Sequence, residues 1–127
     1  MIEKAIYQLL LSDSDVSAIA GDRISVDLAE DVTGPYLVFF LVGGTNPLFL
    51  DGSAGQSRAR VQVDAYAQGA EQVRKLAAAV IALFHGKSVQ SEGYKIQLSE
   101  LVQGPKSSYE SETGLRRQMM EFQFFFD

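Results

Sequence analysis

The sequence holds few residues of the types that catalyse reactions. It contains no cysteine and one histidine, His85, so a cysteine nucleophile and a thiolate metal site are both excluded. His85 falls in the last turn of a predicted helix, where the helix dipole favours a partly positive imidazole. We therefore predict a structural role for His85, because no motif supplies a serine that it would activate.

Two acidic groups resemble metal ligands only superficially. Asp13-Ser14-Asp15 begins like a calcium-binding loop, but that loop requires a glycine at its sixth position and a glutamate at its twelfth. Those positions hold Ala18 and Ile24, so the group is predicted to cap a short helix instead. The second group lies in a predicted loop and comprises Asp27, Glu30 and Asp31. No metal site is expected at either group.

The glycine-rich segment 43–57 lacks the patterns that bind phosphate. It has neither a Gly-Lys-Ser/Thr ending nor Gly-x-Gly-x-x-Gly spacing, and Gly52-Ser53-Ala54-Gly55 is one residue too short for a nucleophile elbow. No cofactor is therefore expected. The apolar tip of this segment, Leu48-Phe49-Leu50, either folds back on the core or inserts into a neighbouring molecule.

Composition bounds the class of protein. The 127 residues are 46% hydrophobic and 21% charged, as expected for one globular domain over residues 1–127. The net charge of −5 and the scattered basic residues argue against a nucleic-acid-binding surface. No signal peptide is visible, and the apolar stretch Tyr36–Val42 is too short to span a bilayer. Intracellular synthesis and no membrane partner are expected.

Hydrophobic periodicity predicts an α+β fold with a mostly antiparallel or mixed sheet of four to five strands and two main helices on one face. The expected main helices are Ile2–Leu10 and Ala70–His85, with a short helix over Val16–Ala20. The expected strands are 24–28, Tyr36–Val42, Arg58–Tyr66, Tyr94–Val102 and Leu115–Phe126. The segments 43–57 and 104–114 are expected to be long loops.

Two predicted strands carry apolar residues on both faces. Arg58–Tyr66 alternates cleanly, whereas Tyr36–Val42 does not, and Phe124-Phe125-Phe126 ends the last strand with three aromatic rings. Either these strands are central and lie between helices on opposite faces, or one face packs against another subunit. We favour the subunit interface, because monomers rarely expose large apolar patches.

The ordered set of motifs resembles one protein family. An N-terminal amphipathic helix leads to Gly21-Asp22-Arg23-Ile24, then Gly34-Pro35-Tyr36-Leu37-Val38-Phe39, and Arg60-Val61-Gln62-Val63-Asp64-Ala65-Tyr66-Ala67 runs into a helix. This arrangement resembles the tail completion (tail terminator) proteins of long-tailed bacteriophages and prophages, the group that includes the phage lambda gpU-like proteins. The similarity covers nearly the whole chain.

The resemblance implies a structural virion protein without enzyme activity, cofactor, metal or catalytic residue. It implies an α+β fold and a self-assembled ring, usually hexameric, at the head-proximal end of the tail. Such a ring caps the tail tube, ends tube polymerisation and presents the surface that joins the head. The implied partners are other copies, the tail tube protein and a head-completion or connector protein, with DNA only as passing cargo through the lumen.

The resemblance carries over no compact motif, so the loops 43–57 and 104–114 are predicted as contact surfaces, and a set of loop and strand residues is predicted at the interface. They are Leu48, Phe49, Leu50, Arg58, Arg60, Tyr109 and Phe125. Two alternatives stay open. One is another head–tail connector of the neck or adaptor type, and the other is a small-molecule-binding α+β domain with a pocket around His85 or Asp64.

Overall fold

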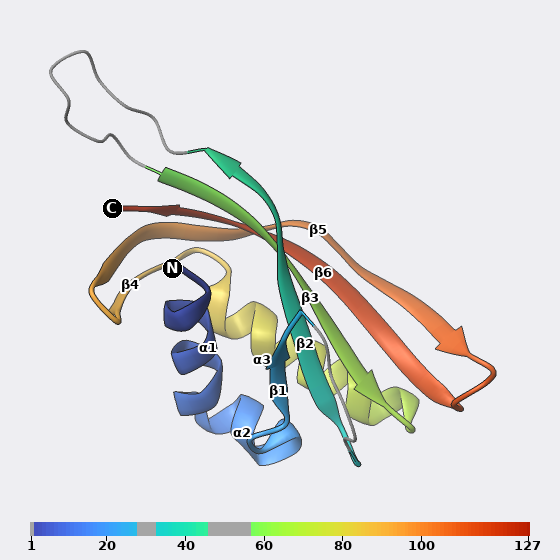
Figure 1. Cartoon of the computed structure of the whole chain (residues 1–127). Helices are drawn as coiled ribbons and strands as arrows, with labels where there is room; N and C mark the ends of the chain where they lie inside the picture. Colours follow the sequence, from blue (N-terminus) through green and yellow to red (C-terminus); the bar gives the residue numbers. More distant parts are fainter. Residues whose placement is uncertain (1, 28–32, 46–56) are drawn as a thin grey trace, which may run out of the picture.

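The computed structural model describes residues 2–27, 33–45 and 57–127 (Figure 1). Its helices are α1 (Ile2–Ser12), α2 (Ser14–Ala20) and α3 (Ala70–Phe84). Its strands are β1 (Ile24–Val26), β2 (Tyr36–Thr45), β3 (Ser57–Ala67), β4 (Lys87–Ser91), β5 (Tyr94–Glu110) and β6 (Leu115–Phe126). Leu48, Phe49 and Leu50 lie outside the described residues.

The strands form one mixed sheet in the order β1-β2-β3-β6-β5-β4. β1 pairs with β2 in parallel, and the other neighbours are antiparallel. The sheet curls around the three helices, which all lie on one of its faces (Figure 1). The predicted α+β class, mixed sheet and one-sided helix layer are thus confirmed. The described chain has six strands and three helices, against the predicted four to five strands and two main helices.

The start of α2 shows what the first acidic group does. Asp13 is the N-cap residue, and its carboxylate accepts a hydrogen bond of 3.0 Å from the backbone N–H of Val16. Such a cap satisfies one of the free N–H groups at a helix start. Gly21 ends the helix with a φ of 59°, and its N–H donates to the carbonyl of Ser17. The predicted caps are confirmed at both ends.

Arg23 joins the motif of residues 21–24, to which it belongs, to the motif of residues 34–39. Its Nε donates to the carbonyl of Pro35 at 2.7 Å, and its Nη2 donates to the carbonyl of Ile19 at 3.0 Å. Gly34 lies close to the same guanidinium. The side chain therefore fastens the start of β2 to the end of α2, and this contact explains why the two motifs occur together.

The core lies between the helices and the inner face of the sheet. Phe84 of α3 packs edge-to-face on Phe122 and Phe124 of β6, with ring centroids 5.5 and 5.2 Å apart. All three rings are fully buried, and such pairs stabilise a core beyond the burial of their area. On β2, Leu37 and Phe39 are also fully buried. One face of each two-faced strand therefore packs under the protein's own helices.

Three parts of the sheet were not predicted, and the first is the end of β2, which continues from its expected end at Val42 to Thr45. β4 was left unassigned because its five residues include one aliphatic side chain, Val89, and none is fully buried. β5 was expected to end at Val102, but it continues to Glu110 and leaves only a short turn before β6. The expected loop 104–114 is therefore wrong. Hydrophobic alternation marks a strand that has one buried face, and residues 102–109 are exposed throughout.

A glycine makes the extension of β5 possible. Gly104 has a φ of 91°, and it lies where the β5–β6 register shifts between Gln103 and Lys106. A Cβ placed there would lie 2.4 Å from the carbonyl oxygen of Met119. Real Cβ atoms do not approach backbone this closely, so the position requires glycine.

We predict that Gly104→Ala lowers the free energy of unfolding by about 1–3 kcal/mol, because of both the positive φ and the clash. Chemical denaturation measures the change. Gly43→Ala is the matched control, because a Cβ at Gly43 meets no atom within 4 Å. Equal stability of the two variants would contradict the described path of β5.

Candidate assembly surface

The face of the sheet that carries no helix is the candidate functional surface, and we call it the outer face. Its side chains alternate with the buried ones along the central strands. The residues are Tyr36, Val38 and Phe40 of β2; Arg58, Arg60, Gln62, Asp64 and Tyr66 of β3; and Arg117, Met119, Glu121, Gln123 and Phe125 of β6. The surface therefore mixes aromatic, aliphatic and charged groups.

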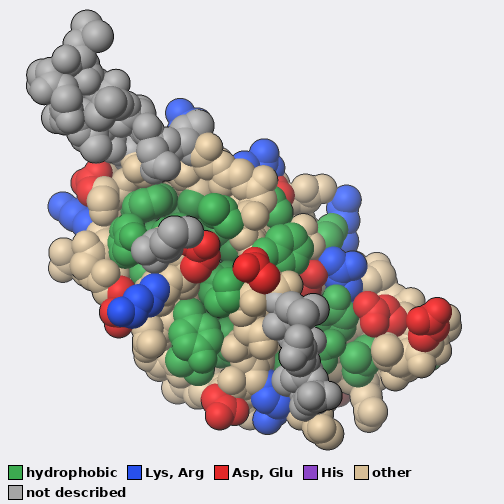
Figure 2. All heavy atoms as spheres, viewed as in Figure 1, with side chains coloured by type: hydrophobic (Ala, Val, Ile, Leu, Met, Phe, Trp, Pro, Cys, Tyr) green, Lys and Arg blue, Asp and Glu red, His purple; other side chains and the backbone are tan. Residues whose placement is uncertain are grey.

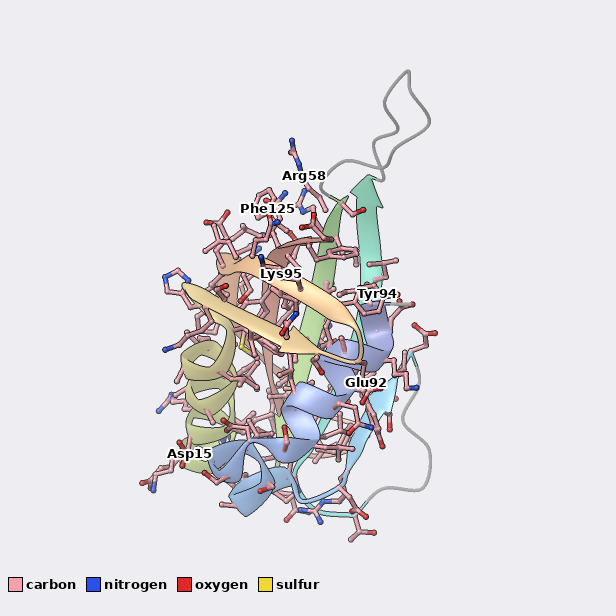
Figure 3. All side chains as sticks on the ribbon, turned by 90° about the vertical axis from the view of Figure 1, so that its left-hand side faces the viewer. Asp15, Arg58, Glu92, Tyr94, Lys95 and Phe125 are labelled. Atoms are coloured by element: carbon pink, nitrogen blue, oxygen red, sulfur yellow. The ribbon has the colours of Figure 1, made fainter. Side chains whose placement is uncertain are left out.

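Three of the predicted interface residues meet at one end of the outer face. The guanidinium of Arg58 lies 5.7 Å from the centre of the Phe125 ring, a cation–π contact, and Figure 3 shows the two side chains together at the end of the sheet. Arg60 forms an ion pair with Glu121 of β6. Arg58 and Arg60 both remain exposed. This end of the outer face is thus basic and aromatic.

The other end of the outer face holds a more buried group, which we call the Asp64 cluster: Tyr36, Gln62, Asp64, Tyr66 and Arg117. Asp64 is only 4% exposed. Its carboxylate accepts a hydrogen bond of 2.8 Å from Arg117 Nη2 and one of 3.1 Å from Gln62 Nε2. Tyr36 and Tyr66 stack with ring centroids 4.8 Å apart, and Arg117 lies 5.9 Å from the Tyr66 ring.

Burial and charge shift the pKa values inside this cluster. Burial raises the pKa of Tyr36 and of Tyr66, and the carboxylate of Glu110 raises both further, while Arg117 opposes the rise at Tyr66. For Arg117, burial disfavours the charge, but the hydrogen bond and negative charge of Asp64 outweigh it and raise the pKa. The cluster therefore holds neutral tyrosines around a tightly paired Arg117–Asp64 couple.

The Asp64 cluster is suited to hold strands together rather than to catalyse a reaction. Asp64 already bonds two donors, so it has little freedom to take a proton from a substrate. Across residues 2–27, 33–45 and 57–127, no three acidic or histidine side chains group as metal ligands. No helix in the same residues is long and apolar enough to cross a membrane.

His85 lies apart from this surface. It directly follows α3 as the C-cap residue, and its Nδ1 accepts a hydrogen bond of 3.1 Å from the backbone N–H of Leu101. The contact fastens the end of α3 to β5. The helix was predicted to include His85, whereas α3 ends one residue earlier, at Phe84. The role of His85 in the structure is to connect α3 with β5.

The remaining predicted residue, Tyr109, lies near the tip of the β5–β6 hairpin. It is 57% exposed, and the guanidinium of Arg116 lies 5.3 Å from its ring centre. Acidic side chains gather at the same tip (Figure 2), where Glu110 and Glu112 occur in the sequence. The structure thus brings Arg58, Arg60 and Phe125 together and leaves Tyr109 separate from them.

Sequence reasoning missed the Asp64 cluster. The available signal was Asp64 itself, an acid on the polar face of a strand that alternates cleanly. Its partner Arg117 is 53 residues away in the chain, and only the pairing of β3 with β6 shows that the two are neighbours.

We predict that Asp64→Asn destabilises the protein by about 1–3 kcal/mol, because it removes the charge that compensates a half-buried Arg117. Glu121→Gln is the matched control, since it breaks the more exposed pair with Arg60 and should cost less than about 1 kcal/mol. Thermal and chemical denaturation of both variants measure the difference. The reverse order of effects would contradict the assigned role of Asp64.

The stacked tyrosines predict a loss of stability at alkaline pH. Their pKa values in the folded state are raised above the ordinary 10.0, so the folded protein keeps these protons when the unfolded chain has lost them. The resulting stability is present below pH 10 and is lost as pH rises through the folded-state values. The double variant Tyr36→Phe with Tyr66→Phe should show a shallower fall, measured by denaturation from about pH 9 to 11. Identical slopes would contradict the raised pKa values.

Comparison with known proteins places this surface in context. The family model of tail completion protein gp17 matches residues 4–127. A chain from the solved virion of a native gene transfer agent particle aligns with a TM-score of 0.72 and 17% identity, over 96% of this chain and 91% of that one. A second solved chain aligns with a TM-score of 0.63 and 14% identity, over 99% and 93%. These likenesses show a shared fold.

A search of curated sequences gives no significant match. The family match, by contrast, spans almost the whole chain and agrees with the resemblance seen in its motifs. The chain belongs to the tail completion protein gp17 family, and it is a structural protein of a phage-type tail, located in the virion.

Proposed function

We propose that the protein is a tail terminator. Six copies assemble into a ring on the head-proximal end of the tail tube, end tube polymerisation and present the surface that joins the head-completion or connector protein. DNA passes through the central opening as cargo. Family membership supports the tail location, and the net charge of −5 suits a lumen through which DNA must slide without binding.

The observation that carries the proposal is the one-sided helix layer. All three helices pack on the inner face of the sheet (Figure 1), so the outer face offers a broad surface to other molecules. This surface combines the ring of Phe125 with exposed Arg58 and Arg60. Aromatic and arginine side chains are enriched in protein interfaces. Such a face fits contact with other virion proteins better than contact with a small molecule.

A small-molecule site has less support. A cavity of about 780 Å³ lies at one end of the sheet, with Ile2, Leu41, Tyr94 and Phe126 in its wall. Neither His85 nor Asp64 lines it. Asp64 is closed off by its bonds to Arg117 and Gln62, so the residues that would have suggested an enzyme are already engaged.

The test of the proposed function is assembly with and without tail tubes. We expect native mass spectrometry and negative-stain microscopy to show a six-membered ring with a central hole, either in solution or on tube ends. Substoichiometric amounts added to a polymerising tube protein should shorten the tubes. A chain that stays monomeric at high concentration and also fails to bind tube ends would refute the proposal.

The charge reversal Arg58→Glu should weaken assembly about tenfold, which corresponds to about 1.4 kcal/mol. It removes the cation–π contact with Phe125 and inverts the charge of the basic end of the outer face. Arg74→Glu makes the same charge change on the exposed side of α3 and serves as the control. The unfolding midpoints of both monomers are measured in parallel, so that any stability lost with the cation–π contact is separated from the loss of assembly. Equal assembly of the two variants would remove the outer face from the interface.

A further inference from the structure

The sheet has two edges, and each edge is only half covered. β4 pairs with β5 from Tyr94 to Ser99, and β1 pairs with β2 from Leu37 to Phe39. In the described chain, no strand pairs with the outward side of β2 over Phe40–Gly44 or of β5 over Val102–Glu110. We call these stretches the β2 half-edge and the β5 half-edge. Each presents backbone donors and acceptors to a potential partner strand.

The exposed apolar side chains gather on the same edges. The described residues include six large hydrophobic side chains that are exposed, and all six lie on β1, β2 or β5. Four belong to the half-edges: Leu41 (42%), Val42 (44%), Val102 (40%) and Tyr109 (57%). The central strands β3 and β6 have none. Free backbone groups beside exposed apolar side chains are the features of a strand that receives another strand.

The two half-edges lie at opposite ends of the sheet and on opposite edges. The β2 half-edge follows β1 toward the end of β2 that lies near Arg58, whereas the β5 half-edge follows β4 toward the hairpin tip. β5 also runs opposite to β2, because three antiparallel pairings separate them. When two copies lie side by side, the β5 edge of one therefore faces the β2 edge of the next in antiparallel orientation, and a shift along the strand direction brings the two half-edges level.

We propose that the subunits of the ring join head to tail through one continuous sheet, in which the β5 half-edge of each copy pairs with the β2 half-edge of the next. This inference rests on the proposed ring and specifies its subunit contact. The pairing satisfies the free backbone groups of both edges and buries Val42 and Tyr109 between copies. It is a heterologous contact, which closes into a ring when the rotation per subunit fits.

The offset between the half-edges sets the geometry of closure. The pairing can be followed across the sheet from β5 through β6 and β3 to β2. It puts Ser107 and Ser108 of β5 level with Leu37 and Tyr36, at the start of β2. The β2 half-edge begins only at Phe40, so the neighbouring copy must shift along the strand direction. Closed sheets require such a stagger, which tilts the strands relative to the ring axis.

The β5 half-edge also contains features that limit indiscriminate pairing. Pro105 has no N–H to donate, and the register shifts around it while Lys106 adds a charge. Edge strands use bulges, proline and lysine to avoid aggregation. Beyond these residues the register with β6 is regular from Lys106 to Glu110. The new ladder should therefore form along this last stretch.

Disulfide mapping tests the contact, because the chain has no cysteine of its own. One set of variants carries Cys at Lys106, Ser107, Ser108, Tyr109 or Glu110, and each is mixed with Val42→Cys and oxidised. We expect cross-links at alternate β5 positions, since strand side chains alternate between faces. With Phe40→Cys in place of Val42→Cys, the best partner should move toward Glu110, as antiparallel pairing requires.

Two controls accompany the mapping. Arg74→Cys on α3 should give no cross-link with either set, and any single variant oxidised alone should stay uncross-linked, since the contact joins two different edges. Hydrogen exchange on the wild-type protein is a second measurement that needs no substitution. On assembly, amides within Phe40–Gly44 and Lys106–Glu110 should exchange at least about tenfold more slowly, as expected for newly formed ladder bonds.

The outcomes separate the two proposals. The edge pairing would be overturned if the wild-type protein forms rings, the cysteine variants give no alternating cross-links, and assembly does not slow exchange. The proposal of a ring would then stand. A wild-type chain that forms no ring, alone or on tubes, would overturn both. Alternating cross-links that shift in the parallel sense would also overturn the proposed arrangement.

Discussion

The antiparallel pairing of β3 with β6 is the constraint on which the rest of the structure depends. Its register runs without a shift from Ser57–Phe126 to Ala67–Arg116. The same register that puts Val63 and Met120 under the helices puts Asp64 and Arg117 on the outer face. A slip of one residue would exchange the faces, exposing the core and burying the charged groups. The large aromatic rings of β6 make such a slip very costly.

The pairing also explains the strands with apolar residues on both faces. Phe124 and Phe126 are buried on the inner face, whereas Phe125 lies on the outer face beside Arg58. β2 divides in the same way, with Leu37 and Phe39 in the core and Phe40 half-buried outside. The alternative of helices on opposite faces is wrong, because the three helices of the described residues lie on one side of the sheet (Figure 1).

The success of the sequence predictions followed the pattern of burial. α3 and β6 were placed within about one residue, because each buries one regular stripe and exposes the other. β4 and the end of β5 were missed, since strands without a buried face carry no alternation to detect. The Asp64–Arg117 pair could not be predicted, because it depends on the pairing of strands far apart in sequence. Of the predicted interface residues, Leu48, Phe49 and Leu50 lie outside the described residues, so their role stays a prediction.

The central pairing also has a kinetic consequence. Its partners are separated along the chain by 49 residues at Ala67–Arg116 and by 69 residues at Ser57–Phe126. Folds dominated by such distant contacts form slowly, because the loop must close before the contacts stabilise it. Until β6 arrives, the edge of β3 that does not pair with β2 lacks its neighbour, and its apolar residues are open to wrong partners. Newly made chains are therefore most prone to aggregate before the centre of the sheet closes, and variants that weaken this centre should lower soluble yield.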